Sequence, residues 1–514
     1  MGNFQWLQTR DDLAWYLNIP LKKLTYLLYG VQNDKLYSSF EIPKRSGGCR
    51  VICAPIDDLK HIQRRLADRL ADYQREIREE NGIKANVSYA FEKGRGIIEN
   101  AYQHKNKKYV FNIDLSNFFE SFHFGRVLGY FEKNRYFLVP HEAAVAIVQL
   151  VCFNGHLPQG SPASPIITNL ICQTLDHYLI QIAKKFRLDY TRYADDITFS
   201  TNDASFYLCH EKFMRSITAQ IERAGFSIND KKTRMQTRRE RQVVTGLVVN
   251  KKVNINRQFY RKTRAMAHTL YTQGRFEING NSATIDQLEG RFSFIDQVDR
   301  HNREKNEGTV KLNAHEKQYQ KFLFYKYFFA SDAPVILTEG ISDHFYLKAS
   351  LKALYKNYPN LITLNDNKFH FKVKLVNRSR RMERLFRMSK DGGGDSFSYL
   401  YNCFTGGRDA TNYFEKFTKI CKCGPKFPTI ILLDNESSPG KPLRKFINGL
   451  KNSGARNIDD INSELKSNLY SLLVENSKFY ILTLPLPDGR RECEMEDLFC
   501  STCFDNCFGG RKFD

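Results

Sequence analysis

The chain has 514 residues and a formal net charge of +22, with 42% hydrophobic and 13% aromatic residues. This length exceeds one ordinary core, so we expect at least two domains, and the apolar content excludes a wholly disordered chain. The positive charge favours a polyanionic partner such as nucleic acid. The sequence shows no membrane-spanning apolar run and no signal pattern, which predicts a cytoplasmic protein without membrane contact.

Cysteine usage predicts reduced thiols rather than a disulfide framework, because twelve cysteines are spread over a long chain. The C-terminal cluster has no histidine near it. We interpret this cluster as buried structural thiols and leave a zinc site open as the alternative. Its members are Cys493, Cys500, Cys503 and Cys507.

Apolar spacing and turn residues predict the elements of the first part of the chain. Period-two apolar runs indicate strands, and apolar stripes at helical spacing indicate amphipathic helices. We expect short helices in 1–36, paired strands in 40–55, helices at 57–80, 141–153, 164–186 and 206–225, strands at 109–114, 188–192, 197–199 and 242–250, and a basic helix at 258–274.

The second part of the chain follows a polar stretch at 300–318, which we interpret as a linker or a domain-edge helix. After it, strands alternate with helices, which predicts a small α/β domain with a mainly parallel sheet. Acidic residues follow some of these strands, where such sheets bind ligands. The predicted elements are strands at 335–338, 429–433 and 480–484 and a helix at 343–355, with a basic segment at 378–390.

The tetrapeptide Tyr193-Ala194-Asp195-Asp196 is the most informative motif in the sequence. Adjacent aspartates at a hairpin tip raise each other's proton affinity unless a cation lies between them. Mg²⁺ takes carboxylate oxygens and keeps positions open for phosphate, whereas the alternative is a solvated turn. A third carboxylate, Asp114, ends another apolar strand, and two-metal phosphoryl transfer needs such a convergence.

Residues 36–250 carry several motifs in the order of a reverse transcriptase, and the chain resembles that family. Besides the tetrapeptide, the matching segments are Asp114 with Phe118-Phe119, Gln159-Gly160-Ser161-Pro162, Ala224-Gly225-Phe226-Ser227-Ile228-Asn229, and Phe40-Glu41-Ile42-Pro43-Lys44 with Arg50. The resemblance implies that Asp114, Asp195 and Asp196 are catalytic and bind metal. It also implies nucleotide contacts by Lys44, Arg50, Phe119, Gln159, Gly160 and Lys232.

Two further motifs narrow the resemblance to bacterial retron reverse transcriptases. They are Asn100-Ala101-Tyr102-Gln103-His104 and Val244-Thr245-Gly246. The resemblance implies RNA-directed DNA synthesis primed from a guanosine 2′-hydroxyl of a cognate noncoding RNA, giving branched RNA–DNA (msDNA). It also implies that Asn100, His104, Val244, Thr245 and Gly246 bind RNA.

The expected fold is an α+β right-hand polymerase followed by an α/β domain with a mainly parallel sheet. We place fingers and palm in residues 1–250, and the thumb with a connecting segment in 251–320. The basic helix at 258–274 would be the part of the thumb that lies against the nucleic-acid duplex. Residues 330–514 would form a separate effector domain.

Glu339 follows an apolar strand of this second part, and Asp434 and Glu436 follow another. Residues two positions apart on a strand share a face, so Asp434 and Glu436 could hold one cation. Helix capping by these acids is the alternative. The segment Thr338-Glu339-Gly340-Ile341-Ser342-Asp343 resembles the Toprim domain of overcoming-lysogenization-defect-like nucleases. This chain departs from that family at Glu436, where the family has aspartate, and at the following Ser437-Ser438-Pro439-Gly440.

The Toprim resemblance implies a metal-dependent nuclease with Glu339, Asp434 and Glu436 as catalytic metal ligands and Glu496 as a further ligand. Lys441 would contact phosphate. Mg²⁺ is the expected ion, two per active site in both halves, with Mn²⁺ as the alternative.

The leading interpretation is a retron reverse transcriptase fused to a Toprim effector that acts in abortive anti-phage defence. Expected partners are the cognate noncoding RNA, msDNA, dNTPs and cellular or phage nucleic acid. In one alternative the C-terminal half only scaffolds the RNA–DNA product, and in another the chain is a template-independent polymerase. Oligomeric state, the phage trigger and the effector's choice of DNA or RNA stay open.

Overall fold

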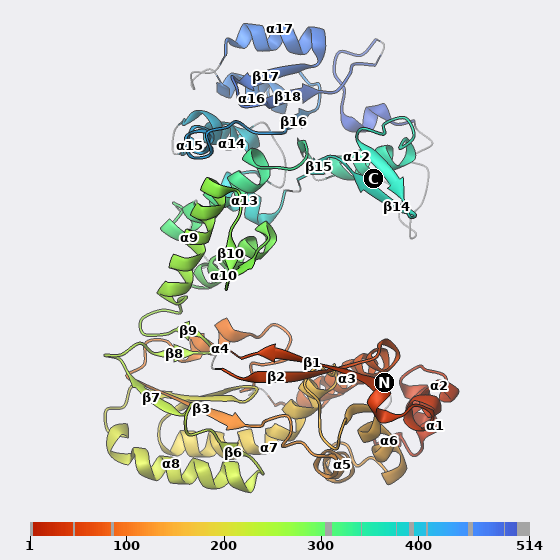
Figure 1. Ribbon diagram of the computed structural model, residues 1–514, viewed down its shortest axis with the longest axis vertical. Helices are drawn as coiled ribbons and strands as arrows, with labels where there is room; N and C mark the ends of the chain where they lie inside the picture. The colour runs from red at the N-terminus through yellow and green to blue at the C-terminus, as the bar shows by residue number, and fades with distance from the viewer. Residues whose placement is uncertain are drawn as a thin grey trace. The chain divides into compact units, whose positions relative to one another are not determined.

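The computed structural model describes residues 4–44, 47–83, 87–303, 311–340, 342–376, 378–389, 395–407, 410–450, 456–487 and 489–500. The chain divides into two compact units, Met1–Asn256 and Arg257–Asp514 (Figure 1). The helices predicted as thumb therefore belong to the second compact unit. Among the described residues, none of the helices combines the length and apolarity that a membrane span needs.

The first unit is built on an antiparallel sheet in the strand order β4-β5-β3-β6, with β7 also paired to β3. Helices α7 (Ser164–Lys185) and α8 (Phe206–Arg223) lie side by side along this sheet (Figure 1). The strand bounds are β3 Tyr109–Ser116, β4 Asp189–Tyr193, β5 Asp196–Thr201, β6 Ser227–Ile228 and β7 Arg234–Thr237.

A hairpin and a long helix precede this sheet in the chain. Strands β1 (Tyr37–Pro43) and β2 (Cys49–Pro55) pair in antiparallel fashion, and α3 (Asp57–Glu80) follows, as the sequence predicts. Helix α3 buries an apolar stripe at three- and four-residue spacing, which fixes the face it turns to the core. The other elements here are η1 Phe4–Trp6, α1 Arg10–Tyr16, α2 Leu21–Thr25, η2 Tyr26–Gly30, η3 Asn33–Leu36, α4 Ile97–Gln103, α5 Phe124–Lys133 and α6 His141–Val151.

The prediction of one strand over 242–250 is wrong, because this segment folds back on itself. It forms a hairpin of β8 (Val243–Val244) and β9 (Leu247–Val248). The two loop residues, Thr245 and Gly246, have φ angles of 46° and 83°. A two-residue hairpin loop with positive φ at both positions matches the twist of its strands. The glycine inside the apolar run was the sequence signal for this turn.

The second unit contains a five-stranded sheet in the order β15-β12-β16-β18-β17. The first four strands are parallel, and only β17 runs antiparallel to its neighbour. This confirms the predicted mainly parallel sheet. The strand bounds are β12 Val335–Thr338, β15 Lys374–Leu375, β16 Thr429–Leu433, β17 Tyr470–Val474 and β18 Phe479–Thr483.

The helices that open the second unit share one hydrophobic core with this sheet. The same buried cluster includes Leu270 of α9 (Arg257–Gln273), Phe292 of α10 (Ile285–His301) and Leu433 of β16. Helix α11 (Ala314–Phe324) joins this core. The stretch 300–318 therefore contains the end of α10 and the start of α11 inside one unit, and residues 304–310 lie outside the described residues.

The remaining elements of the second unit were only partly predicted. The sequence patterns found α12 (Asp343–Ala353) but missed the β10–β11 and β13–β14 hairpins and the helices α13 to α17. The other elements are β10 Glu277–Ile278, β11 Asn281–Ser282, η4 Tyr325–Phe329, β13 Ile362–Asn365, β14 Lys368–Phe371, α13 Arg380–Phe386, α14 Asp395–Thr405, α15 Tyr413–Cys421, α16 Pro442–Leu450, α17 Ile458–Asn468 and η5 Met495–Leu498.

Candidate active sites

The antiparallel pairing of β3 with β5 brings three distant carboxylates together in the first unit. Asp114 lies directly opposite Asp196 in the ladder. The backbone N–H of Leu115 donates to the carbonyl oxygen of Asp195 at 3.1 Å. The structure therefore gathers the three predicted catalytic acids at one point of the sheet.

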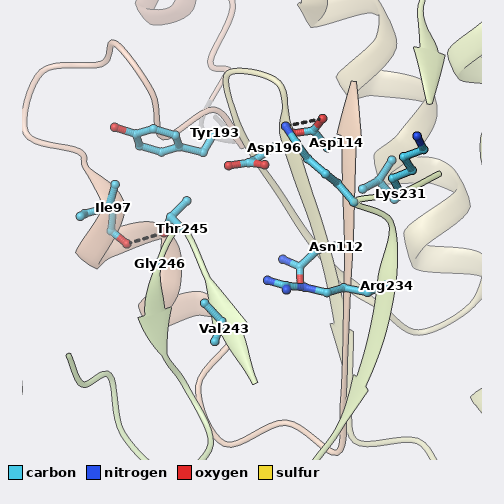
Figure 2. A pocket seen from close by; sticks show the side chains of 12 residues that line it. Ile97, Asn112, Asp114, Tyr193, Asp196, Lys231, Arg234, Val243, Thr245 and Gly246 are labelled. Carbon is cyan, nitrogen blue, oxygen red and sulfur yellow. Dashed lines mark hydrogen bonds and ion pairs between the residues drawn. The ribbon is translucent and has the colours of Figure 1, made fainter. Parts of the chain in front are cut away.

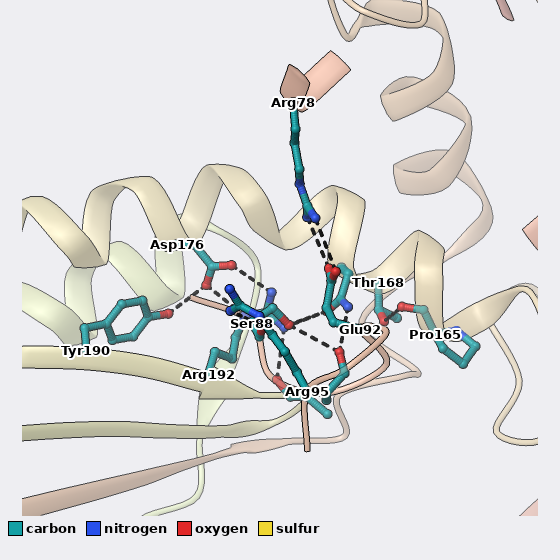
Figure 3. Close-up of polar contacts among 12 residues, drawn as sticks. Arg78, Ser88, Glu92, Arg95, Pro165, Thr168, Asp176, Tyr190 and Arg192 are labelled. Carbon is teal, nitrogen blue, oxygen red and sulfur yellow. Dashed lines mark hydrogen bonds and ion pairs between the residues drawn. The ribbon is translucent and has the colours of Figure 1, made fainter. Parts of the chain in front are cut away.

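The hairpin that carries two of these acids is fixed from behind by a buried ion pair. Arg192, fully buried on β4, donates from Nε and Nη2 to the Asp176 carboxylate of α7 at 2.8 and 2.7 Å (Figure 3). The hydroxyl of Tyr190 donates to the same carboxylate at 2.7 Å. Because both charges are paired and hydrogen-bonded, the hairpin tolerates their burial. Ala194 in the turn has φ of 56°, a strained value for a residue with a side chain.

Burial and mutual repulsion raise the proton affinity of the two adjacent aspartates. Burial raises the pKa of Asp195, and the charge of Asp114 adds to the effect. Burial, followed by the charges of Asp195 and Asp114, raises the pKa of Asp196 to about 6. Asp196 nonetheless has an exposed side chain, so its carboxylate is accessible to a cation. Nearby positive charge stabilises the ionised forms.

Lys232 supplies part of that positive charge. Its ammonium group donates to both Asp114 oxygens, at 3.0 and 2.9 Å, and the Asn229 amide donates to Oδ1 at 3.0 Å. The backbone N–H of Asn229 also donates to the Asp114 carbonyl at 2.8 Å. Lys232 was predicted as a nucleotide contact. Asn229 was not predicted as a site residue, although it ends the quoted 224–229 motif.

Within the part of the chain that the structure describes, no three acidic, histidine or cysteine side chains stand close enough to enclose one ion as placed. The chemistry of the donor set nonetheless fits a divalent cation. Asp114, Asp195 and Asp196 are hard oxygen ligands. Burial, with the charges of neighbouring acids, raises the pKa values of Asp195 and Asp196, and a bound cation would stabilise their ionised forms.

A cavity of about 400 Å³ opens beside these carboxylates (Figure 2). The β8–β9 turn forms part of its wall, and the hydroxyl of Thr245 donates to the carbonyl oxygen of Ile97 at 3.0 Å. Asp114 and Asp196 therefore line the same cavity as Thr245 and Gly246, two residues of the triplet that the sequence predicts to bind RNA. Its lining residues are Ile97, Asn112, Ile113, Asp114, Tyr193, Asp196, Lys231, Lys232, Arg234, Val243, Thr245 and Gly246.

Asn100 and His104, which the sequence predicts to bind RNA, both have fully buried side chains. Thr191 donates to Asn100 Oδ1 at 2.6 Å, and His104 lies 2.7 Å from Thr191 Oγ1 through Nε2 and 2.7 Å from Ser200 Oγ through Nδ1. Burial lowers the pKa of His104 to about 3, so the ring is neutral. Asn100 and His104 therefore hold the β4–β5 hairpin, which carries Asp195 and Asp196, against the α4 segment.

The third residue of that prediction, Val244, also has a fully buried side chain. Only Thr245 and Gly246 of the triplet reach the cavity. A valine with no exposed surface packs the hairpin onto the first unit. RNA binding by Val244, Thr245 and Gly246 stays a prediction, and the two turn residues are the ones that line the cavity.

The predicted nucleotide loop packs closely against the β1–β2 hairpin. The backbone N–H of Cys53 on β2 donates to the Gln159 carbonyl at 2.7 Å. Gly160 has φ of 120°, and a Cβ added there would lie 2.6 Å from the Cys53 carbonyl oxygen. Only glycine fits this contact, because any side chain would clash with backbone. The loop is thereby fixed to the strand that carries Arg50.

The other predicted nucleotide contacts differ in how exposed their side chains are. Arg50 on β2 is exposed, and its charge acts on Asp195. Lys44 is exposed at the end of the same hairpin. Phe119 is half-buried, whereas its neighbour Phe118 is buried in the core. Of the two rings, only Phe119 keeps exposed surface that a nucleotide could contact.

Comparison with known proteins gives the same assignment as the motifs. Residues 42–255 match the family model described as reverse transcriptase (RNA-dependent DNA polymerase). The retron Ec86 reverse transcriptase of Escherichia coli is 32% identical over 295 residues, which are 56% of this chain and 84% of that protein. The chain belongs to the retron reverse transcriptases. It is therefore an RNA-directed DNA polymerase, an enzyme class that uses divalent metal ions.

Two Myxococcus xanthus relatives are also similar to this retron reverse transcriptase. The retron Mx65 enzyme is 32% identical, covering 51% of this chain and 62% of its own length. The retron Mx162 enzyme is 31% identical, covering 57% of this chain and 64% of its own length. The family model lies wholly within the first compact unit, the unit that contains the three aspartates.

The second unit of this retron reverse transcriptase places acids at one edge of its parallel sheet. Glu339 follows β12 and Asp434 follows the adjacent parallel strand β16, so both leave the sheet at the same end. Burial raises the pKa of Glu339, with the Glu436 and Asp343 charges adding to it. Burial, then the charges of Glu339 and Asp343, raise the pKa of Asp434 to about 7.

The remaining predicted acids lie near this edge. Asn435 and Cys493 exchange backbone hydrogen bonds of 2.9 and 3.1 Å, which brings the later acidic segment beside Asp434. The charge of Glu496 then acts on Asp434. Buried Glu436 accepts from Lys441, the lysine predicted to contact phosphate. The structure therefore brings Glu339, Asp434, Glu436 and Glu496 to one edge of the sheet.

Sequence reasoning gave Asp343 no role, although it lies at this edge too. Its carboxylate accepts from the backbone N–H of Gly340 at 2.6 Å. Of the C-terminal cysteines, Cys493 is buried and Cys500 is exposed. Cys503 and Cys507 lie outside the described residues, so the predicted thiol cluster is described only in part.

Proposed function

We propose that this retron reverse transcriptase copies its cognate noncoding RNA into msDNA, starting from a guanosine 2′-hydroxyl. One observation supports this most: Asp114 and Asp196 line the same cavity as Thr245 and Gly246. Primer end, template and incoming dNTP would meet in this cavity. The basic helix α9 (Arg257–Gln273), within the predicted thumb 251–320, would follow the duplex backbone.

Asp114, Asp195 and Asp196 would hold Mg²⁺, with Mn²⁺ as the alternative ion. The bound ions would acidify the attacking hydroxyl and stabilise the leaving pyrophosphate. Lys232 is placed to exchange its Asp114 partner for a phosphate oxygen, because half of its side chain is exposed. Arg50 and Lys44 would balance triphosphate charge from the hairpin, and half-buried Phe119 would contact the sugar.

The test is msDNA synthesis in cells that carry the cognate RNA locus. Asp195→Asn should abolish the branched product, because it removes a carboxylate from the acidic centre. Asp189→Asn is the matched control, since Asp189 lies on the same hairpin but is half-exposed and pairs with Lys107. Product from the Asp195→Asn chain would contradict the proposal, and so would DNA without attached RNA from the wild type.

We further propose that residues 330–514 form a Toprim-type nuclease effector. Its support is the convergence of Glu339, Asp434, Glu436 and Glu496 at the carboxyl edge of a parallel sheet, with the raised pKa of Asp434. These four acids would hold Mg²⁺, which would supply Lewis-acid activation of a phosphodiester. Glutamate at 436 is longer than the family's aspartate and keeps the same ligand chemistry.

In the cell, msDNA would hold this effector in check until phage infection disturbs it. The released effector would then cut cellular or phage nucleic acid and arrest growth. Glu339→Gln and Asp434→Asn should each remove phage defence while msDNA synthesis continues. Full defence by both variants would favour a C-terminal half that only scaffolds the RNA–DNA product.

A further inference from the structure

Arg378 in the second unit is a buried arginine with one unused donor group. Its side chain follows β15 and only 7% of the residue is exposed. Nε donates to the Thr338 carbonyl at 3.1 Å, and Nη1 donates to the Ser389 carbonyl at 2.7 Å. Nη2 is buried and has no hydrogen-bond partner among the described residues. Leaving such a buried donor unmatched destabilises the folded chain.

The unused donor points toward the acidic edge of the sheet. In a planar guanidinium, Nε and Nη2 share one edge, as when Arg192 grips Asp176 with both. Nη2 of Arg378 therefore lies on the side of the Thr338 carbonyl, one residue before Glu339. The ring of Phe397 stacks 4.6 Å from the guanidinium carbon and holds its plane.

A second unmatched group lies near enough for its charge to act on Arg378. Oε2 of Glu339 is buried and lacks a hydrogen-bond partner within the described part of the chain. The charges of Glu339 and Asp343 both act on Arg378, yet no ion pair between these described side chains closes the gap. A buried guanidinium and a carboxylate with one buried oxygen thus lie near each other without an ion pair, as in a site shaped for a group between them.

We propose that Arg378 binds a non-bridging phosphate oxygen of the phosphodiester on which the acidic edge acts. This inference rests on the proposed nuclease function and adds the group that receives the substrate. Phosphate approaching Glu339, Asp343 and Asp434 meets repulsion, and a fixed guanidinium offsets it with a charge-assisted hydrogen bond. Its three other contacts leave Arg378 little freedom to lose on binding.

The first experiment measures cleavage of a short oligonucleotide by the full chain with Mg²⁺. Arg378→Gln should lower kcat/KM about 100-fold, the usual effect of removing one donor to a reacting oxyanion. Arg378→Lys should recover part of this loss because it keeps the charge. Arg380→Gln, an exposed arginine two residues later, is the charge-matched control. Equal activity of the Arg378→Gln and Arg380→Gln chains would overturn the proposal.

A second experiment does not depend on nuclease activity. Crystals of the full chain soaked in tungstate, a phosphate mimic, should show anomalous density within hydrogen-bond reach of Arg378 Nη2. The Arg378→Gln crystals should lack it, and the rest of the second unit should be unchanged. Tungstate beside Arg378 without cleavage by the wild type would refute the nuclease but keep the anion site. Absence of tungstate there in the wild type would refute the anion site.

Discussion

At the scale of single residues, the three acids of the first unit combine burial with repulsion between neighbouring carboxylates. Lys232 pairs with Asp114, while Asp195 and Asp196 keep raised pKa values. A fold accepts such repulsion where a ligand relieves it, which is why shifted carboxylates gather at functional sites. The stability of the chain without metal should therefore depend on these carboxylates and on pH.

The first prediction is that Asp196→Asn stabilises the metal-free chain at pH 8. The folded pKa of about 6 lies above the ordinary value of 3.8, so the ionised carboxylate destabilises the fold above pH 6. The free-energy cost of holding this ionised carboxylate in the fold decreases as the pH falls toward 3.8. Allowing for solvent screening we expect about 1 kcal/mol, or about 2–4 °C in Tm.

Thermal melts in EDTA at pH 8 and pH 5 test this prediction. The gain of the Asp196→Asn chain over wild type should shrink at pH 5, where the wild-type carboxyl is already mostly protonated. Asp189→Asn should give no gain, because Asp189 lies beside a lysine rather than other acids. A larger gain at pH 5 than at pH 8 would contradict the assigned direction of the pKa shift.

At the scale of elements, α4 connects two hairpins of the first unit. Ile97 accepts from Thr245 in the β8–β9 turn, while Asn100 and His104 bind the β4 and β5 residues Thr191 and Ser200. Since Thr191 donates to Asn100, His104 Nε2 must donate to Thr191, and Nδ1 accepts from Ser200. A single neutral tautomer therefore joins the catalytic hairpin to the helix.

The second prediction concerns His104→Ala. Removing the ring leaves two buried hydroxyls with fewer partners and opens a cavity, at a cost of about 2–4 kcal/mol. Because His104 is fully buried and holds the hairpin through Thr191 and Ser200, kcat for DNA synthesis should fall while RNA affinity stays near wild type. His61→Ala, at an exposed position of α3, is the control.

Filter binding of the cognate RNA measures RNA affinity, and primer extension on the same preparations measures kcat for DNA synthesis. A His104→Ala chain that loses RNA affinity in proportion to its activity would support the prediction of a direct RNA contact. Folding is followed by the Tm of the first unit, so that a loss of activity is read only from preparations that remain folded at the assay temperature.

At the scale of the whole molecule, one hydrophobic core contains both the predicted thumb helices and the parallel sheet of the second unit. Leu270 of α9 and Leu433 of β16 belong to one hydrophobic cluster. A buried charge network reinforces it, because Arg384 of α13 binds Asp296 of α10 and Glu316 of α11. Groups that share one core usually unfold together.

The third prediction is that Leu270→Ala and Leu433→Ala lower the same thermal transition. Each removes buried methyl groups, at a cost of about 2–5 kcal/mol. Leu170→Ala on α7, in the core of the first unit, should lower a different transition. Differential scanning calorimetry of the full chain separates the two. If the Leu270→Ala and Leu433→Ala chains lowered different transitions, the thumb helices and the sheet would unfold separately.

The sequence by itself determined several local elements and the acids that stand out from their neighbours. Helix α3 and strands β12 and β16 have the predicted bounds, because burial periodicity and flanking polar residues mark them. The acids at 114, 195 and 196 stand out because adjacent like charges between apolar strands need a counter-charge. Spacing along the chain is enough for such signals.

Only the tertiary structure decided which side chains reach the sites and which elements share a core. Burial of Asn100, His104 and Val244 depends on packing between segments far apart in sequence, and a motif cannot show which way its members face. The unmatched donor of Arg378 appears only once β15 lies beside β12. Long-range contacts set these features, because hydrogen-bond partners and exclusion of water are properties of the folded chain.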